Sequence, residues 1–261
     1  MLIYSTDFNL MPKLVENIKI TLWLDETSEK FKSFNRLFRW TYNIYKDAFA
    51  KKHRTTWERY FEHLRAVVNK VLELPNPSIQ KVFIALSHDT IEDTILTYEW
   101  IKLSLWVRDL ESWAKIALWV KAISKEPWEN FLNWINTTET EAKKARNEKY
   151  FWHMRSFDSM IRYINTLAVL SWVTISSKEL DKLTQDTLDT KFADRIHNLS
   201  TQWDPDDIEK VERKMKETND YFLDIAKETN PEAYKQLRFE LWKLKISLER
   251  NKKKQEVNNT L

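Results

Sequence analysis

The amino-acid sequence predicts an all-α fold, and three observations support that prediction. Apolar residues recur at i, i+3, i+4 and i+7 through nearly every segment of the 261-residue chain, which is the period of an amphipathic helix. The chain contains no glycine, so it lacks the residue on which tight β-hairpin turns depend. It also contains no cysteine, so the 43% of residues that are hydrophobic must hold the fold together by packing alone.

The predicted helices follow one another along the whole chain. The first places Phe34 and Phe38 on one apolar stripe, and Pro75 ends the second sharply. Asn76 is expected to cap the third helix, with Pro77 at its first position. In order, the expected helices cover residues 28 to about 52, 60–74, 77–93, 101–123, 150–170, 178–199, 205–230 and 231 to about 249.

These helices are expected to form a single domain, residues 1–250, whose core runs from about residue 45 to residue 230. The most polar interior stretch, residues 124–149, is interpreted as a solvated connection within this domain. A run of basic residues begins at Arg250, and residues 251–261 are expected to form a flexible basic tail.

Charge and hydropathy narrow the class of partner. The net charge is 42 − 39 = +3, which is not the strong basic excess of a nucleic-acid or membrane binder. No stretch reaches the roughly 18 apolar residues that a membrane span needs, and the start of the chain lacks a signal-peptide pattern. We therefore expect a soluble, cytoplasmic protein with no nucleic-acid partner and no membrane partner.

The segment LSHDTIEDT, residues 86–94, carries the first cluster of chemical groups. Asp89, Glu92 and Asp93 put carboxylates into the last turns of a predicted helix, where the helix dipole favours cations instead. On a helix His88 shares a face with Glu92, and Asp89 shares one with Asp93, so the two faces could surround a cation. Imidazole with carboxylate suits divalent first-row metals. The alternative is a solvated helix end with a chance His–Asp pair.

A second segment, TKFADRIHNLST at residues 190–201, carries groups that can join this cluster. Asp194, Asn198 and Thr201 fall within about 60° of one another on the polar side of a helix. Such a polar stripe can line a cleft while the opposite face packs. His197 is interpreted as a structural residue that orients Asp194 or its loop.

A third segment, HRTTWERYFEHLRAVV at residues 53–68, places His63 on an amphipathic helix after a basic, hydroxyl-rich turn. With this segment the chain resembles the HD-domain hydrolases of the RelA/SpoT-type alarmone enzymes, in their stand-alone small form, over roughly residues 45–230. HDTIEDT combined with a downstream KFADRIHNLST is the specific part of the resemblance. The resemblance implies that the domain is an HD-domain helical bundle, and the residues that carry it are His63, His88, Asp89, Glu92, Asp93 and Asp194.

The resemblance also implies an activity and a role for each site residue. Such an enzyme is a Mn²⁺-dependent pyrophosphohydrolase that removes the 3′-pyrophosphate of (p)ppGpp and leaves GDP or GTP, so its partner is a small nucleotide. Glu92 and Asp93 would be the catalytic residues that position and activate the attacking water. The implied ligands of the single Mn²⁺ are His63, His88, Asp89 and Asp194. The implied substrate-binding residues are Arg54, Thr56, Tyr60, Asn198 and Thr201.

Two departures from the family pattern keep other functions open. Thr55 stands where the family usually has a basic residue, and Ser200 stands where it usually has arginine. One alternative is therefore an HD phosphohydrolase of another nucleotide, such as NADPH or a nucleoside phosphate. The other is a non-catalytic alarmone-binding helical protein, although the intact Glu92 and Asp93 argue against a pure binder.

The absence of glycine coincides with an excess of tryptophan. An average chain of this length would carry roughly 18 glycines at about 7% usage, whereas this chain has none and has 13 tryptophans. Trp57, Trp119 and, more loosely, Trp106 stand where the resembling family typically has glycine. We hypothesise that many of these tryptophans are UGA codons that the source organism reads as glycine. The alternative is genuine drift in composition.

Overall fold

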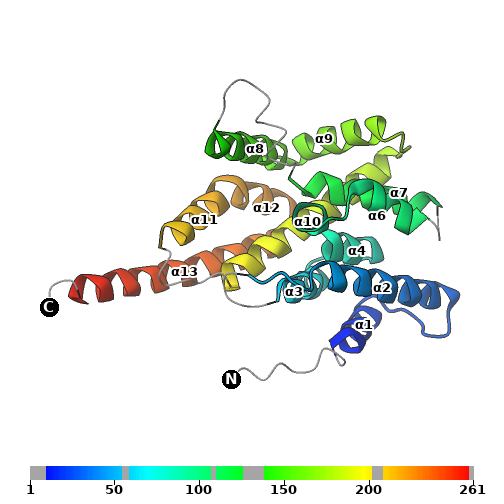
Figure 1. Ribbon diagram of the computed structural model, residues 1–261, viewed down its shortest axis with the longest axis horizontal. Coiled ribbons are helices and arrows are strands. Elements are labelled where there is room, and N and C mark those ends of the chain that lie inside the picture. Colours follow the sequence, from blue (N-terminus) through cyan, green and yellow to red (C-terminus); the bar gives the residue numbers. More distant parts are fainter. Residues whose placement is uncertain (1–9, 55–58, 107–109, 126–137, 202–207, 259–261) are drawn as a thin grey trace.

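The fold is all-α, as the sequence predicts. In the computed structural model, helices are the regular elements wherever the chain is described, and an isolated bridge joins His53 to Arg59 (Figure 1). The structure describes residues 10–54, 59–106, 110–125, 138–201 and 208–258. In chain order the helices are α1 (Leu10–Thr21), α2 (Glu29–Ala48), α3 (Tyr60–Glu73), α4 (Ile79–Ser87), α5 (Thr90–Asp93), α6 (Tyr98–Trp106), α7 (Leu110–Ile123), α8 (Glu139–Met154), α9 (Phe157–Leu170), α10 (Ser177–Thr201), α11 (Ile208–Tyr221), α12 (Leu223–Thr229) and α13 (Pro231–Asn258).

The long helix α10 lies at the centre of the molecule. It packs against α3, α4, α7, α9, α11 and α13, and Figure 1 shows it crossing the middle of the bundle. Its apolar residues Leu188, Phe192, Ile196 and Leu199 are buried and recur at helical spacing. Any polar residue that α10 presents between its neighbours is therefore enclosed by several helices.

Aromatic side chains fill the core between α2 and α4. Phe34 and Phe38 meet Phe83 edge to face, with ring centroids 5.9 and 6.0 Å apart. All three side chains are buried, which confirms the apolar stripe predicted for the first helix. This contact holds α4, whose end leads into His88, against α2.

A buried cluster of charges joins α4 to α10. The Nζ atom of Lys81, which is 1% exposed, lies 2.6 Å from Asp189 Oδ2 and 3.6 Å from Asp186 Oδ1. It also donates to the carbonyl oxygens of Pro75 and Asn76, at 2.9 and 3.1 Å. A buried ammonium is stable only with such partners in place, so this cluster ties α4 to α10.

Some predicted helix starts are wrong because a capping side chain intervenes. Asn76 does not cap the third helix but has a φ of 53°. Ser78 caps α4 instead, because its hydroxyl accepts the backbone N–H of Lys81 at 3.1 Å. The predicted helix 150–170 is two helices, since Ser156 caps α9 in the same way.

Other corrections concern polar and basic stretches. Residues 124–149 are not a connection throughout, because a reciprocal capping box between Thr138 and Glu141 starts α8. The predicted helix 205–230 divides into α11 and α12. The predicted helix 101–123 corresponds to α6 and α7, and residues 107–109 between them lie outside the described residues. The predicted tail is helical as far as residue 258, because α13 continues through the basic run, where Lys252 Nζ pairs with Glu212 Oε1 at 2.6 Å. None of the described helices combines the length and the apolar character that a membrane span requires.

Two helices end in a turn that favours glycine, and tryptophan occupies the turn both times. Trp23 after α1 and Trp172 after α9 have φ values of 51° and 56°. The residue after each tryptophan donates its N–H to the carbonyl five residues earlier, at 3.0 and 2.9 Å, which is the hydrogen bond of a Schellman motif. The two indoles are 94% and 95% exposed, so almost no packing offsets the cost of the left-handed backbone.

The three tryptophans singled out in the sequence analysis have different surroundings. Trp119 is fully buried, and its indole nitrogen has no hydrogen-bond partner among the described residues. Trp106 is the last residue of α6, and Trp57 lies outside the described residues. The hypothesis of glycine codons therefore acquires its clearest structural support at Trp23 and Trp172, which the sequence alone did not single out.

Candidate metal centre

Four side chains from three separate segments of the chain converge at one point. His63 lies on the buried face of α3, and Asp194 lies on α10. The helix predicted for residues 77–93 divides between His88 and Asp89, so that His88 is the C-cap of α4 and Asp89 is the N-cap of α5. Both imidazoles are almost fully buried, and the two carboxylates are nearly so.

The ligand atoms of these side chains are closely spaced. His63 Nε2 lies 3.2 Å from His88 Nε2 and 3.1 Å from Asp194 Oδ1. Asp89 Oδ2 lies 3.1 Å from His88 Nε2 and 3.5 Å from His63 Nε2, and His88 Nε2 lies 3.7 Å from Asp194 Oδ1. An ion bound at about 2.1 Å separates its ligand atoms by about 3.0 Å at right angles and about 3.4 Å at tetrahedral angles. The observed spacings therefore fit one divalent ion, and His63, His88 and Asp194 by themselves form a group that could hold it.

Hydrogen bonds to Nδ1 of the two imidazoles would leave Nε2 as the ligand atom of each ring when an ion displaces the proton there. His88 Nδ1 lies 2.8 Å from the carbonyl oxygen of Ala85, which can only accept, so Nδ1 carries the hydrogen. His63 Nδ1 lies 2.8 Å from His197 Nδ1, and Arg54 Nη1 lies 3.4 Å from the same atom. Burial, with the charges of His63 and Arg54, lowers the pKa of His197 to about 3, so His197 is neutral and can accept. His63 Nδ1 is then the donor.

The carboxylates of the centre are held in the anionic form. Burial raises the pKa of Asp194, but hydrogen bonds from His63 and His88 and the charge of Lys191 hold it well below its usual range. Lys191 Nζ, on a buried side chain, lies 3.8 Å from Asp194 Oδ2. Burial opposes the charged form of His88, yet Asp89 and Asp194 raise its pKa to about 10. Carboxylates that draw a proton onto a neighbouring imidazole present the negative charge that a divalent cation would balance.

The two predicted catalytic carboxylates have different partners. The Tyr60 hydroxyl lies 2.8 Å from Asp89 Oδ2 and 2.6 Å from Asp93 Oδ2, so it bridges a predicted ligand and a predicted catalytic residue. Burial and these two carboxylates raise the pKa of Tyr60, which keeps the phenol protonated as a donor. Glu92 Oε1 accepts the backbone N–H of Lys125 at 2.8 Å. Because the Tyr60 hydroxyl contacts both Asp89 and Asp93, these two carboxylates lie on the same side of their segment, as predicted.

An open cavity with about 1020 Å³ of empty space lies against the centre. His63, Asp89 and Asp194 line it, together with Glu92 and Asp93. Around these acids the lining is strongly basic, which suits a ligand that carries several negative charges. The basic lining residues other than histidine are Arg54, Lys125, Lys191, Arg195, Lys210 and Lys214.

The structure brings most of the predicted substrate-binding residues to this cavity. Arg54 is buried and donates to Asn198 Oδ1, and Asn198 in turn donates to Asp194 Oδ1 at 2.6 Å. Arg54, Asn198 and Tyr60 line the cavity. Thr201 is not among the described residues that do so, and its hydroxyl donates to the backbone carbonyl of His197 one turn earlier. Thr56 lies outside the described residues.

Sequence reasoning missed several lining residues. Lys191 could have been found, because it precedes Asp194 by three residues and therefore neighbours it on one helix face. Lys125 and Tyr150 have no such local signal, since other helices bring them to the cavity. The role predicted for His197 concerned Asp194 or its loop, whereas its Nδ1 lies 2.8 Å from His63 Nδ1.

A scan of protein-family models finds no match to this chain, and a search of curated proteins finds none either. The fold and the site therefore define the class of protein by themselves. It is an all-α protein with a buried His–Asp group that could hold a metal ion, set under a basic cavity.

Proposed function

We propose that this chain is a Mn²⁺-dependent phosphohydrolase of the HD-domain type that removes the 3′-pyrophosphate of (p)ppGpp. The observation that carries the proposal is the convergence of distant side chains beneath a basic cavity. The resemblance of HDTIEDT and KFADRIHNLST to the alarmone hydrolases supplies the nucleotide. The residues proposed to hold the ion are His63, His88, Asp89 and Asp194.

The donor set suits the proposed ion, because mixed imidazole and carboxylate ligands are accepted by divalent first-row metals. When bound, the ion supplies Lewis-acid stabilisation of a phosphoryl oxygen and lowers the pKa of a water molecule. In the reaction the oxygen of water bonds to phosphorus, the bond from phosphorus to the ribose 3′ oxygen breaks, and that oxygen receives a proton.

Glu92 and Asp93 are proposed to take and return that proton. Asp93 Oδ2 is held by the Tyr60 hydroxyl at 2.6 Å, while its Oδ1 lies 3.2 Å from Lys52 Nζ. Glu92 is held through the backbone N–H of Lys125, and both carboxylates face the cavity. Carboxylates fixed in this way can accept a proton from the attacking water and pass it to the leaving oxygen.

Further basic residues that line the cavity are proposed to neutralise the phosphates. Arg195 on α10 and Lys210 and Lys214 on α11 line the same cavity. Burial and the neighbouring charge of Arg195 lower the pKa of Lys214, although Glu217 opposes this effect. Positive charge is therefore crowded here, and an anionic ligand would relieve the crowding.

The test is an assay of the full chain with Mn²⁺ and ppGpp, GTP or NADPH, in which pyrophosphate and phosphate release are followed separately. We expect pyrophosphate from ppGpp. Asp194→Asn should abolish this release and Mn²⁺ binding, whereas Asp181→Asn, at an exposed position of the same helix, should retain both. Phosphate released from GTP or NADPH would favour another nucleotide substrate, and binding of ppGpp without turnover would indicate a reader. Undiminished Mn²⁺ binding by Asp194→Asn would refute the metal centre.

A further inference from the structure

A buried lysine of α10 lies beside the metal centre. The Lys191 side chain is only 6% exposed, and it lines the large cavity together with Asp194. Lys191 precedes Asp194 by three residues, so the two side chains are neighbours on one face of the helix. The proposed hydrolysis gives a role to Arg195, Lys210 and Lys214 but none to this ammonium.

A second buried lysine, Lys81, shows how a buried ammonium is normally satisfied. Its Nζ lies 2.6 Å from Asp189 Oδ2 and donates to two backbone carbonyl oxygens at 2.9 and 3.1 Å, so each of its three N–H groups has an acceptor. Lys191 Nζ instead lies 3.8 Å from Asp194 Oδ2, which is beyond hydrogen-bond distance. Within the described part of the chain, no carboxylate or carbonyl oxygen is within hydrogen-bond distance of the Lys191 ammonium.

The other close neighbour of Lys191 is the phenol of Tyr150. Lys191 Nζ lies 5.4 Å from the centroid of the Tyr150 ring. Burial raises the pKa of Tyr150 to about 12, although the charge of Lys191 and a hydrogen bond from it oppose this effect. The phenol is therefore neutral near neutral pH and does not balance the ammonium. Because an ammonium has three N–H donors, Lys191 keeps donors for an oxygen atom in the cavity.

The surroundings of Lys191 keep its ammonium charged. Burial lowers the pKa of Lys191, but nearby groups raise it above its ordinary value, in the order Tyr150, Asp194, Glu92 and Asp89. An ammonium that retains its proton contributes a fixed positive charge, which is worth more in a site shielded from water than at the surface. When the same carboxylates bind a divalent ion, this charge favours an anionic ligand in the cavity.

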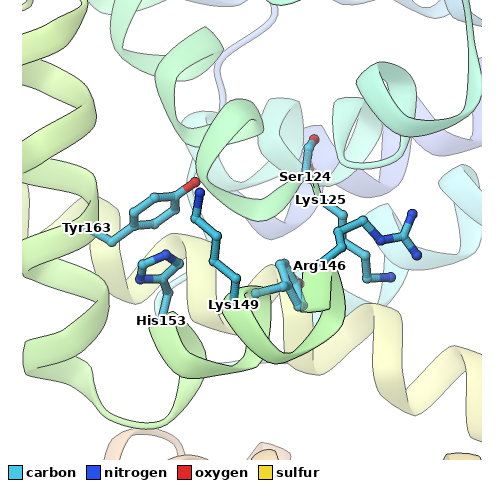
Figure 2. Close-up of a pocket in the computed structure, with 7 residues that line it drawn as sticks. Ser124, Lys125, Arg146, Lys149, His153 and Tyr163 are labelled. Carbon is cyan, nitrogen blue, oxygen red and sulfur yellow. The ribbon is translucent and has the colours of Figure 1, made fainter. Parts of the chain in front are cut away.

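Lys125 is the lining cation most similar in position, but it is more exposed. Its Nζ also lies 5.4 Å from the Tyr150 ring centroid. Its side chain is 29% exposed and lies 3.8 Å from Glu92 Oε2. Figure 2 shows this side chain extending alongside Arg146 at a small neighbouring pocket, which Lys125 also lines. Water therefore screens the charge of Lys125 more than that of Lys191.

We propose that Lys191 is a catalytic residue whose ammonium contacts a phosphoryl oxygen of the substrate at the metal centre. This inference rests on the proposed function. Asp194 joins the two partners, because its Oδ1 lies 3.1 Å from His63 Nε2 in the ligand group while its Oδ2 lies 3.8 Å from Lys191 Nζ. A phosphoryl group at the centre can therefore present one oxygen to the ion and another to the ammonium. The ammonium stabilises the negative charge on the phosphoryl oxygens while the bond to the leaving oxygen breaks.

The test is the binding of inorganic pyrophosphate, a product of the proposed reaction, to the Mn²⁺-loaded full chain, measured by equilibrium dialysis. Lys191→Gln should weaken pyrophosphate binding by about tenfold or more, because a charge-assisted contact in a buried site is lost. Lys178→Gln is the matched control, since Lys178 is exposed on the same helix, and it should bind pyrophosphate like the parent protein. Undiminished pyrophosphate binding by Lys191→Gln would overturn the proposal.

The affinity for Mn²⁺ separates a contact to the substrate from a role in positioning Asp194. If the ammonium contacts the substrate, Lys191→Gln should bind Mn²⁺ at least as tightly as the parent protein, because a positive charge near the ion has been removed. We expect this result, together with a kcat for ppGpp that is lower by about 100-fold. If Lys191→Gln binds Mn²⁺ more weakly than the parent protein, Lys191 positions Asp194 and the proposed contact is wrong.

Far-UV circular dichroism checks that the variant folds. If Lys191→Gln does not fold, Lys191→Met takes its place with the same outcomes, because methionine has a long unbranched side chain that suits a buried position. Neither binding measurement needs turnover, so the two failures are distinguishable. A parent protein that binds Mn²⁺ and pyrophosphate but hydrolyses no nucleotide would refute the proposed activity, whereas undiminished pyrophosphate binding by the variant would refute the role of Lys191 alone.

Discussion

Replacing Trp23 and Trp172 by glycine should stabilise the protein. Both residues hold a left-handed backbone, with φ values of 51° and 56°. This conformation costs a residue with a Cβ atom about 1–2 kcal/mol, while glycine loses roughly 0.5–1 kcal/mol more backbone entropy on folding. The indoles are 94% and 95% exposed, so their removal sacrifices almost no burial. We expect a net gain of about 1 kcal/mol in the free energy of unfolding for each substitution.

Urea unfolding followed by far-UV circular dichroism measures this gain. The midpoint should rise without a change in slope. The double variant should gain about 2 kcal/mol, because the two turns end different helices, α1 and α9, and we expect their effects to add. At this chain length the melting temperature should rise by about 2–4 °C for each kcal/mol.

The matched control is Trp152→Gly, for which we expect the opposite sign. Trp152 is 57% exposed but lies inside α8, where glycine costs about 1 kcal/mol relative to a good helix former. Its indole also packs against Arg155, whose guanidinium carbon lies 3.3 Å from the ring centroid. If Trp23→Gly and Trp172→Gly destabilise the protein as Trp152→Gly does, the argument from backbone conformation is refuted.

Three further predictions follow from buried charge, pH and mass. Lys81→Met should lower the free energy of unfolding by about 3–5 kcal/mol, because it leaves Asp189 buried without its cation; an unchanged urea midpoint would contradict this. Hydrogen bonds from Lys115 and Ser176 lower the pKa of Glu179 from 4.5 to about 2, so Glu179 stabilises the fold above pH 4.5 and loses this effect as the pH falls through about 2. Glu179→Gln should accordingly melt at a lower temperature than the parent protein near neutral pH and at a similar temperature near pH 2, and a pH-independent difference would count against the assignment. Protein isolated from its native host should have an intact mass below 31.6 kDa, and a mass that matches 13 tryptophans would end the hypothesis of glycine codons.

The helices could be predicted from the sequence because each buries one apolar stripe. Phe34 and Phe38 illustrate this, since the spacing that marks their helix also brings them to Phe83. The breaks between helices were harder to predict. Ser78 and Ser156 act as caps only where the chain already turns, and serine is also tolerated inside helices.

The candidate site could be predicted only in pieces. Asp194 and Asn198 are neighbours through helical spacing alone, and their hydrogen bond confirms it. That His63 meets Asp194 depends on the packing of α3 against α10, which no local pattern encodes; the resemblance to known hydrolases supplied that link. The acceptor role of His197 toward His63 depends on the same packing and was therefore missed.

The pairing of Lys81 with Asp189 sets the register of two helices. His88 lies seven residues beyond Lys81, and Asp194 lies five residues beyond Asp189, so both pairs run along the same contact between α4 and α10. Helices that touch through apolar side chains alone can slide past one another at small cost, because such contacts have no direction. An ammonium between carboxylates stops that sliding. The spacing of imidazole and carboxylate at the candidate centre is thus maintained by a salt bridge that touches neither of them.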